Sequence, residues 1–341
     1  MRPLRLRRVV GLEGRANDVV FYPAPRPVTP PHKLGALVFF GGDVQDYPEI
    51  MQAHRDYRNY LKYNLETTAR MLGHNFPTKH VVVVKPSRIE YKSFSCYDNF
   101  VPGNNAGVPD HTPTHSALLH LERLLQGVSC RLKSLPTAEL LEAASALPEE
   151  IDIEDLPVNL QKTQRAVGGA GAGSAPHEPR SVVWWREGLR LEQCPLTLVG
   201  FSKGCVVLNQ FIYEFHYANT LTPGDDHMRR LMSGISAMYW LDGGHAGTKN
   251  TWLTARSLLE TLARLNVNIY VHVSPYQVED EGRPWIGREE RAFTALLRKL
   301  GAKVKRYLHE QPGAPHSLHM HFEVLTSFAT RTRNDTDDDQ M

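Results

Sequence analysis

The chain has 341 residues, of which 41% are hydrophobic and 22% charged, and its formal net charge is +2 at pH 7. This is the composition of a globular protein with enough residues for one large or two small domains. No apolar run reaches the ~18 residues that a membrane-spanning helix needs. The basic residues are scattered, so the charge balance gives no electrostatic footprint for nucleic acid, and we expect no nucleic-acid partner. The cysteines lie far apart and form no Cys-x-x-Cys pair, which indicates neither a zinc knuckle nor a disulfide framework.

The amino terminus has two interpretations that the sequence leaves open. Residues 1–8 contain four arginines and no acidic residue, which is typical of the start of a mitochondrial targeting segment. The apolar run continues through residues 9 and 10, so residues 4–12 equally fit a first β-strand with a basic outer face.

The first part of the chain alternates between predicted strands and helices. Residues 4–11 and 18–22 fit two short strands, and a proline-dense connection follows at 23–31. Residues 34–40 form an apolar run that predicts a buried parallel strand. Residues 48–72 have the spacing of an amphipathic helix.

After a further buried strand at residues 80–85, the middle of the chain is less regular. Residues 87–113 are aromatic, polar and rich in turn residues, which predicts a lid or pocket wall; the aromatic residues at 91–100 are candidates to line an acyl pocket. Helices are predicted at 114–125 and 135–147. Residues from about 148 to 180 are acidic and then rich in Gly, Ala and Ser, a composition that predicts a disordered insertion.

The last part of the chain repeats a strand–helix alternation. The predicted strands are residues 196–199, 235–241, 267–274 and 303–308, and the predicted helices are residues 205–217, 251–265, 288–300 and 318–328. Such alternation predicts an α/β fold with a doubly wound, mostly parallel sheet and helices on both faces. We expect residues 1–330 to form a single α/β-hydrolase-like domain and residues 331–341 to form a disordered acidic tail.

The motif that points to a function lies between the strand at 196–199 and the helix at 205–217. It reads Gly200-Phe-Ser-Lys-Gly204, the Gly-x-Ser-x-Gly pattern of the nucleophile elbow in α/β-hydrolases. The serine of such an elbow sits on a strained turn, where flanking glycines avoid collisions. Ser202 is therefore the candidate nucleophile.

A serine nucleophile needs a histidine base and an acid that orients the histidine, and on this fold they follow the serine in the order acid, then histidine. Asp242 and Asp280 each follow a predicted strand, and Asp280 follows the strand that usually carries the acid, so we rank it first. The candidates for the base, after the last strand, are His309, His316, His319 and His321. Generic spacing favours His316.

The oxyanion of an acyl-transfer reaction needs two backbone donors, one from the residue after the nucleophile and one from the first strand-to-helix loop. Lys203 N–H fits the first role, and Gly42 or Asp43 N–H fits the second. No residue pattern around the histidines matches a zinc or iron site, and we predict no metal and no cofactor.

Several segments resemble one family. They are Phe39-Phe-Gly-Gly-Asp-Val-Gln-Asp-Tyr47, Tyr239-Trp-Leu-Asp-Gly-Gly-His245, Ser-Pro-Tyr-Gln-Val at 274–278 and Trp285-Ile-Gly287. With the elbow, they are similar to the family named for human chromosome 2 open reading frame 69. The resemblance implies a mitochondrial matrix protein with an α/β-hydrolase-like fold, serine-esterase activity and a link to respiratory function. The family's terminal block implies His321 as the base, ahead of His316.

These observations predict a serine hydrolase that cleaves an ester or thioester through an acyl-enzyme, with Ser202, Asp280 and His321 as its triad. Its expected partner is a small-molecule acyl substrate. The alternative is a catalytically inactive hydrolase scaffold that binds an acyl ligand or a protein partner. A nucleotide-binding domain is disfavoured, because no glycine-rich phosphate loop follows the first strands.

Overall fold

The computed structural model describes residues 1–29, 33–146, 183–310, 313 and 315–338, with side chains described as far as 333. The insertion predicted at about 148–180 lies outside the described residues.

An eight-stranded sheet forms the centre of the structure, in the order β1-β2-β4-β3-β7-β8-β9-β10. Its strands are β1 (Leu4–Val10), β2 (Ala16–Tyr22), β3 (Gly35–Phe40), β4 (Lys79–Val84), β7 (Leu196–Phe201), β8 (Ile235–Leu241), β9 (Asn268–Val273) and β10 (Val304–Leu308). Strand β2 pairs antiparallel with both β1 and β4, and all the other pairings are parallel. The predicted mostly parallel sheet is therefore confirmed.

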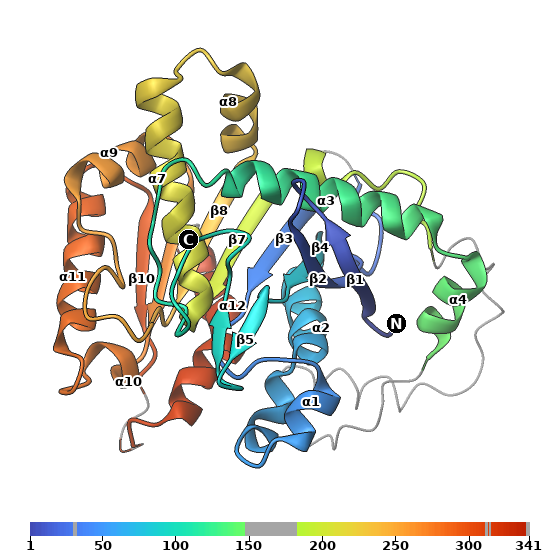
Figure 1. Ribbon diagram of the computed structural model, residues 1–341, viewed down its shortest axis with the longest axis horizontal. Helices are drawn as coiled ribbons and strands as arrows, with labels where there is room; N and C mark the ends of the chain where they lie inside the picture. Colours follow the sequence, from blue (N-terminus) through green and yellow to red (C-terminus); the bar gives the residue numbers. More distant parts are fainter. Residues whose placement is uncertain (30–32, 147–182, 311–312, 314, 339–341) are drawn as a thin grey trace.

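Helices cover both faces of this sheet (Figure 1). One face carries α3 (Ala117–Ser134), α7 (Cys205–Leu221), α9 (Arg256–Arg264) and α11 (Pro284–Lys299), and the other carries α2 (Leu65–Asn75) and α12 (Leu318–Asp338). All residues of the central strands β3 and β7 are buried, because helices cover them on both sides. The core is accordingly divided into two clusters, one on each face of the sheet.

The shorter elements lie around this frame. They are α1 (Pro48–Ala53), η1 (Tyr57–Tyr63), β5 (Arg88–Glu90), β6 (Phe94–Cys96), α4 (Thr137–Ser145), η3 (Leu191–Gln193), η4 (Ser202–Gly204), α8 (Asp226–Ser233) and α10 (Pro275–Val278). The pair β5–β6 is a separate antiparallel hairpin near α1 and the lower ends of the parallel strands in Figure 1.

Two predicted segments differ from the structure. The single helix expected at residues 48–72 is divided into α1, η1 and α2, because the side chain of Asn64 caps a new helix by accepting hydrogen bonds from Glu66 N and Thr67 N. The tail expected to be disordered from residue 331 continues instead as helix α12 to Asp338. Within it Thr332 is buried, and its hydroxyl lies 3.2 Å from His272 Nε2.

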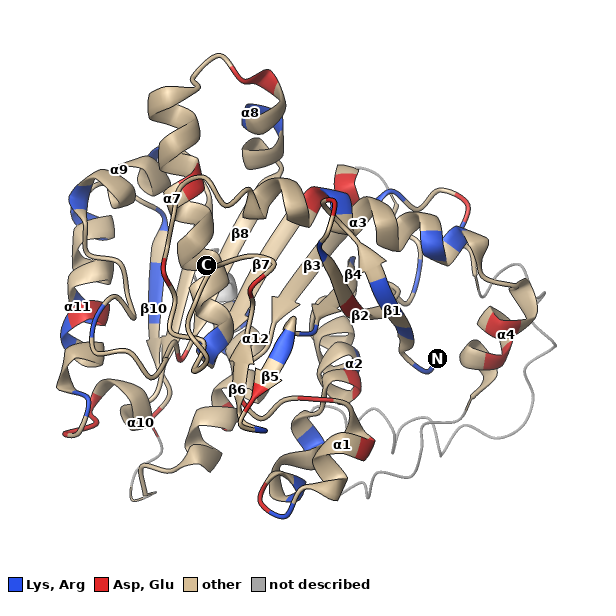
Figure 2. Cartoon of the chain, viewed as in Figure 1, with Lys and Arg blue, Asp and Glu red and all other residues tan. Residues whose placement is uncertain are grey.

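Charged residues of both signs are interspersed over the helices, strands and loops (Figure 2). Within the part of the chain that the structure describes, no helix combines the length and apolar character of a membrane-spanning segment.

Candidate active site

The sheet register places two candidate catalytic residues side by side. Strands β7 and β8 pair in parallel, with their last residues, Phe201 and Leu241, opposite each other. Ser202 and Asp242 are the first residues after these two adjacent strands. Both have left-handed backbone conformations, with φ of 52° for Ser202 and 49° for Asp242. Non-glycine residues rarely adopt positive φ, and such strain concentrates at functional sites.

The glycines around the elbow are required by close backbone contacts. A Cβ on Gly204 would lie 2.0 Å from Phe40 O, and a Cβ on Gly200 would lie 2.9 Å from Cys205 Cα. A Cβ on Gly42 would lie 2.7 Å from the Cβ of Ser202, so the loop after β3 packs directly against the serine. Any side chain at these three positions would collide with neighbouring atoms, so the packing requires glycine there.

Asp242 is the acid that contacts a histidine. Its Oδ2 accepts a hydrogen bond from His321 Nδ1 at 2.7 Å, and both side chains are buried. Ser274, directly after β9, holds the same carboxylate: its backbone N–H donates to Oδ1 at 2.7 Å and its hydroxyl to Oδ2 at 2.5 Å. The carboxylate therefore has three donors that fix its orientation.

The sequence ranking of the two acids is corrected by this geometry. Asp280 lies beyond α10 and pairs with Arg283 at 2.6 Å, and this hydrogen bond holds the pKa of its carboxyl below the usual value. Its side chain is 29% exposed, whereas that of Asp242 is fully buried. Asp242, which sequence reasoning ranked second, is the acid that meets His321.

The four candidate histidines do not converge on one place. His316 is 49% exposed and lies 3.9 Å from Glu279, and His319 is exposed and lies 3.6 Å from Glu323. His309 is buried and shares a hydrogen bond of 2.9 Å with His272. His321 alone among the four contacts an acid in the candidate site.

His321 is held by aromatic packing as well as by Asp242. Its ring stacks on Phe201 with centroids 4.6 Å apart and lies 5.5 Å from the ring of Tyr276. It belongs to the first turn of α12, whose next residue, Phe322, packs on Tyr63 and Phe201. The ring is thus fixed between the elbow strand and α10.

The candidate oxyanion donors are distinguished by their hydrogen bonds. Gly42 N–H donates to the side-chain oxygen of Gln45 at 2.9 Å, so it is already committed within the protein. This contact leaves Asp43 N–H and Lys203 N–H as the two candidate donors. Gln45 itself is held by donation to Tyr63 O at 2.7 Å, which gives the loop after β3 a fixed shape.

The side chain of Lys203 ties the elbow to the segment that covers it. It is fully buried, donates to Ala106 O at 2.7 Å and lies 3.9 Å from a carboxylate oxygen of Asp43. Burial lowers the pKa of Lys203 and raises that of Asp43. Sequence reasoning did not foresee the burial of this lysine, because a lysine is usually exposed.

A cavity of about 220 Å³ lies over these groups. Ser202 and His321 both line it, as do Asp43, Phe94 and Gly244. Further lining residues that sequence reasoning missed are His245, Tyr276, Gln277, Arg283 and Leu318. The signal that could have found Ser274, Tyr276 and Gln277 is their position directly after β9, at the same edge of the sheet as Ser202.

His245 occupies this cavity as a neutral ring. It is buried, its Nδ1 accepts a hydrogen bond from Gly247 N at 2.9 Å, and burial lowers its pKa to about 4. At neutral pH it therefore adds no charge beside Ser202.

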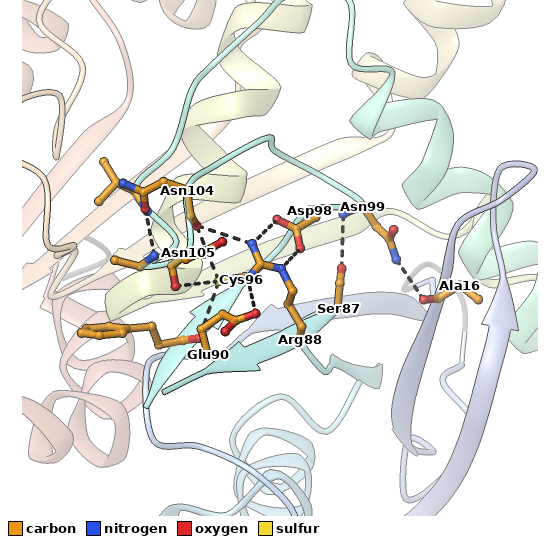
Figure 3. Close-up of polar contacts among 12 residues, drawn as sticks. Ala16, Ser87, Arg88, Glu90, Cys96, Asp98, Asn99, Asn104 and Asn105 are labelled. Carbon is orange, nitrogen blue, oxygen red and sulfur yellow. Dashed lines mark hydrogen bonds and ion pairs between the residues drawn. The ribbon is translucent and has the colours of Figure 1, made fainter. Parts of the chain in front are cut away.

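The segment predicted as a lid or pocket wall, residues 87–113, is held together by its own polar contacts (Figure 3). Arg88 donates to Asp98 and to Glu90, each at 2.6 Å, and reaches Asn104 O at 3.5 Å. The thiol of Cys96 lies among the carbonyls of the same loop. Phe94 of this segment lines the cavity, so the segment does form one of its walls.

The comparison with protein families identifies the group to which the chain is related. The family model described as C2orf69 matches residues 5–303. The chain belongs to the C2orf69 family. It is 34% identical over 326 residues to the mitochondrial protein C2orf69 homolog of Mus musculus, covering 95% of this chain and 87% of that protein. It is 35% identical over 324 residues to the mitochondrial protein C2orf69 of Homo sapiens, covering 93% and 80%.

Solved structures similar to this chain include esterases. The crystal structure of a thermostable esterase has a TM-score of 0.41 and 11% identity, covering 99% of this chain and 62% of that one. The lipase/esterase from Lactobacillus plantarum has a TM-score of 0.41 and 10% identity, covering 99% of each chain. The sheet order and the strand–elbow–helix unit of this chain are those of an α/β-hydrolase fold.

Proposed function

We propose that the protein is a serine hydrolase that cleaves an ester or thioester through an acyl-enzyme. The observation that carries this proposal is the hydrogen bond between Asp242 and His321, two buried residues, at a cavity that Ser202 also lines. An ionised carboxylate only accepts hydrogen bonds, so Asp242 selects the tautomer of His321 with its proton on Nδ1. The other ring nitrogen, Nε2, is then a free base for the serine.

The proposed reaction follows from these roles. His321 Nε2 accepts the proton of Ser202 as its Oγ attacks the substrate carbonyl. Asp43 N–H and Lys203 N–H stabilise the negative charge on the carbonyl oxygen. The protonated histidine then gives its proton to the leaving alcohol or thiol. In the second half of the reaction water attacks the acyl-enzyme and gives its proton to His321. His321 returns this proton to Ser202 Oγ as the acid product leaves.

We also propose that the protein acts in mitochondria, in the matrix, and that its activity is linked to respiratory function. The support is the name of the related mouse, human and zebrafish proteins, each called a mitochondrial protein. The zebrafish relative is 36% identical over 292 residues.

Labelling by a fluorophosphonate probe tests whether Ser202 is nucleophilic. The purified wild-type chain should be labelled, and Ser202→Ala should not. Labelling that persists in Ser202→Ala, or is absent from the wild type, would contradict the proposal. The second result would favour the inactive scaffold that binds an acyl ligand or a protein.

A matched pair of acid variants tests the assignment of the triad. Asp242→Asn should lower the turnover of a p-nitrophenyl ester by about 10⁴-fold, because the histidine loses the acceptor that sets its tautomer. Asp280→Asn removes a carboxylate of the same type from the surface, where it pairs with Arg283, and should change turnover less than twofold. Equal losses in the two variants would show that the geometric assignment is wrong.

A further inference from the structure

A second, mostly apolar groove begins where the candidate catalytic cavity ends. The groove has a volume of about 340 Å³, and its apolar lining is formed by Val44, Ile50, Met51, Ala53, Tyr57 and Ile89. Val44 also lines the cavity that contains Ser202 and His321. The two spaces therefore meet at one side chain, directly after the candidate oxyanion residue Asp43.

Val44 has a backbone conformation that needs an explanation. Its φ is 76°, a left-handed value that a β-branched residue rarely adopts because of steric cost. Its N–H donates to Ser93 O, next to the hairpin β5–β6. Strained residues of this kind persist at ligand-binding positions, where the surroundings hold them. The strain at Val44 turns the chain at the junction of the two spaces.

The walls of the groove come from two elements on either side of this junction. Residues Ile50, Met51 and Ala53 belong to α1, and Ile89 belongs to β5 of the hairpin. The same hairpin lines the catalytic cavity through Phe94 of β6, since Phe94 pairs with Glu90 across the hairpin. The Arg88 contacts seen in Figure 3 fix this hairpin to the rest of the covering segment.

The groove exposes apolar surface to solvent and has little uncompensated charge. Ile50 is 48% exposed, which is unusual for a large aliphatic side chain. Asp46 also lines the groove, but its carboxylate is paired with Lys85 at 2.5 Å. The ring of His54 stacks on Tyr57 with centroids 3.7 Å apart. Lys92 also lines the groove, but it is exposed, so its ammonium can stay in solvent while an apolar ligand covers the apolar surface.

We propose that the groove binds the alkyl chain of the substrate, so that the protein prefers esters or thioesters of medium-length fatty acids. This inference rests on the proposed hydrolase function, because the chain runs from the carbonyl at Ser202 past Val44 into the groove. A methylene group occupies about as much space as a water molecule, about 30 Å³, so a groove of about 340 Å³ has room for at most about eleven carbons.

The chain-length profile of hydrolysis tests the proposal. With p-nitrophenyl acetate, butyrate and octanoate, kcat/KM should rise with chain length, by up to about fourfold for each methylene that enters the groove. Ala53→Trp fills the groove from an exposed position at the end of α1, and should lower the octanoate-to-acetate ratio of kcat/KM at least tenfold. Gln52→Trp places the same indole on the same helix outside the groove, and should keep the wild-type ratio.

Binding of free decanoate to Ser202→Ala, measured by calorimetry, separates failure of this proposal from failure of the hydrolase proposal. If no ester is hydrolysed but decanoate binds, and adding Ala53→Trp abolishes that binding while Gln52→Trp does not, the groove holds an alkyl chain and only the hydrolase proposal fails. If acetate is hydrolysed without preference for octanoate, or if decanoate does not bind, the groove proposal is overturned.

Discussion

The protein should lose stability steeply in mild acid, because it buries several neutral histidines. Burial lowers the pKa of His80, His120 and His245 to about 4 and that of His309 to about 3, and it places the pKa of His272 well below the usual value. Three of these rings accept a hydrogen bond at Nδ1 from a backbone N–H, donated by Leu12, Ala24 or Gly247. A proton on that nitrogen would break the hydrogen bond.

The sign of the effect follows from proton linkage. An unfolded histidine has a pKa of about 6.5, so below that pH the unfolded chain binds protons that the folded chain does not. The stabilisation is therefore present above pH 6.5 and is lost as the pH falls towards 4. Asp43 and Glu214, whose carboxyl pKa values are raised by burial, act in the opposite direction.

The magnitude is large compared with ordinary protein stability. When the pH falls from 7.5 to 5.5, each such histidine lowers the free energy of unfolding by about 1.4 kcal/mol. These five histidines give about 7 kcal/mol, or about 5 kcal/mol if the hydrogen-bonded pair His272–His309 takes up a single proton in the native state. Burial also lowers the pKa of His111 to about 4, and this histidine adds about 1.4 kcal/mol to the loss. The free energy of unfolding of a folded domain is about 5–15 kcal/mol in total, so a loss of this size should bring the protein close to unfolding at pH 5.5.

Urea unfolding, followed by tryptophan fluorescence at constant ionic strength from pH 7.5 to 5.5, measures this loss. His120→Asn should reduce the pH slope by about one proton, because the unfolded chain then has one histidine fewer to protonate. A free energy of unfolding that changes by less than about 2 kcal/mol across this range would refute the reasoning.

Three further predictions concern the elbow, the support of Asp242 and the cysteines. Gly42→Ala should lower fluorophosphonate labelling at least tenfold with an unchanged circular dichroism spectrum, because its Cβ would meet the Cβ of Ser202 at 2.7 Å; full labelling would contradict the packing described. Ser274→Ala should reduce ester turnover by about tenfold, since Asp242 loses a hydroxyl donor at 2.5 Å, and Ser274→Thr should partly restore it. In the native protein Ellman's reagent should react first with the exposed Cys130, and the buried cysteines should react only after unfolding; fast reaction of all thiols would contradict their burial.

The sheet could be predicted from sequence because its central strands are continuous apolar runs. Every predicted strand corresponds to a strand of the structure, to within a few residues at each end. The hairpin β5–β6 was missed for a physical reason: its strands have three residues each, and its turn places Tyr91 and Lys92 at positive φ. Turns of that kind are normally recognised by Asn-Gly, which is absent here.

Ser202 could be chosen from sequence because the elbow's constraints are local. The two glycines, the strand before it and the helix after it all lie within one short segment. Which acid contacts the histidine depends on a tertiary contact that the sequence does not show. The ranking therefore rested on a rule about which strand usually carries the acid, and that rule placed Asp280 first. His321 was reached only through the resemblance, since spacing along the loop favoured His316.

The sheet register explains why Asp242, and not Asp280, contacts His321. Asp242 directly follows β8, and β8 is the direct neighbour of the elbow strand β7, so its carboxylate lies at the edge of the sheet where His321 is held. Asp280 is separated from its strand by α10 and has an arginine partner of its own. The informative sequence signal was therefore a polar residue placed directly after the last residue of a strand. Asp242 follows Leu241 in this way, and Ser274 follows Val273 on the next strand. When two adjacent strands are each followed by a polar residue, beside a strand that is followed by a serine, the three residues are expected at the same edge of the sheet.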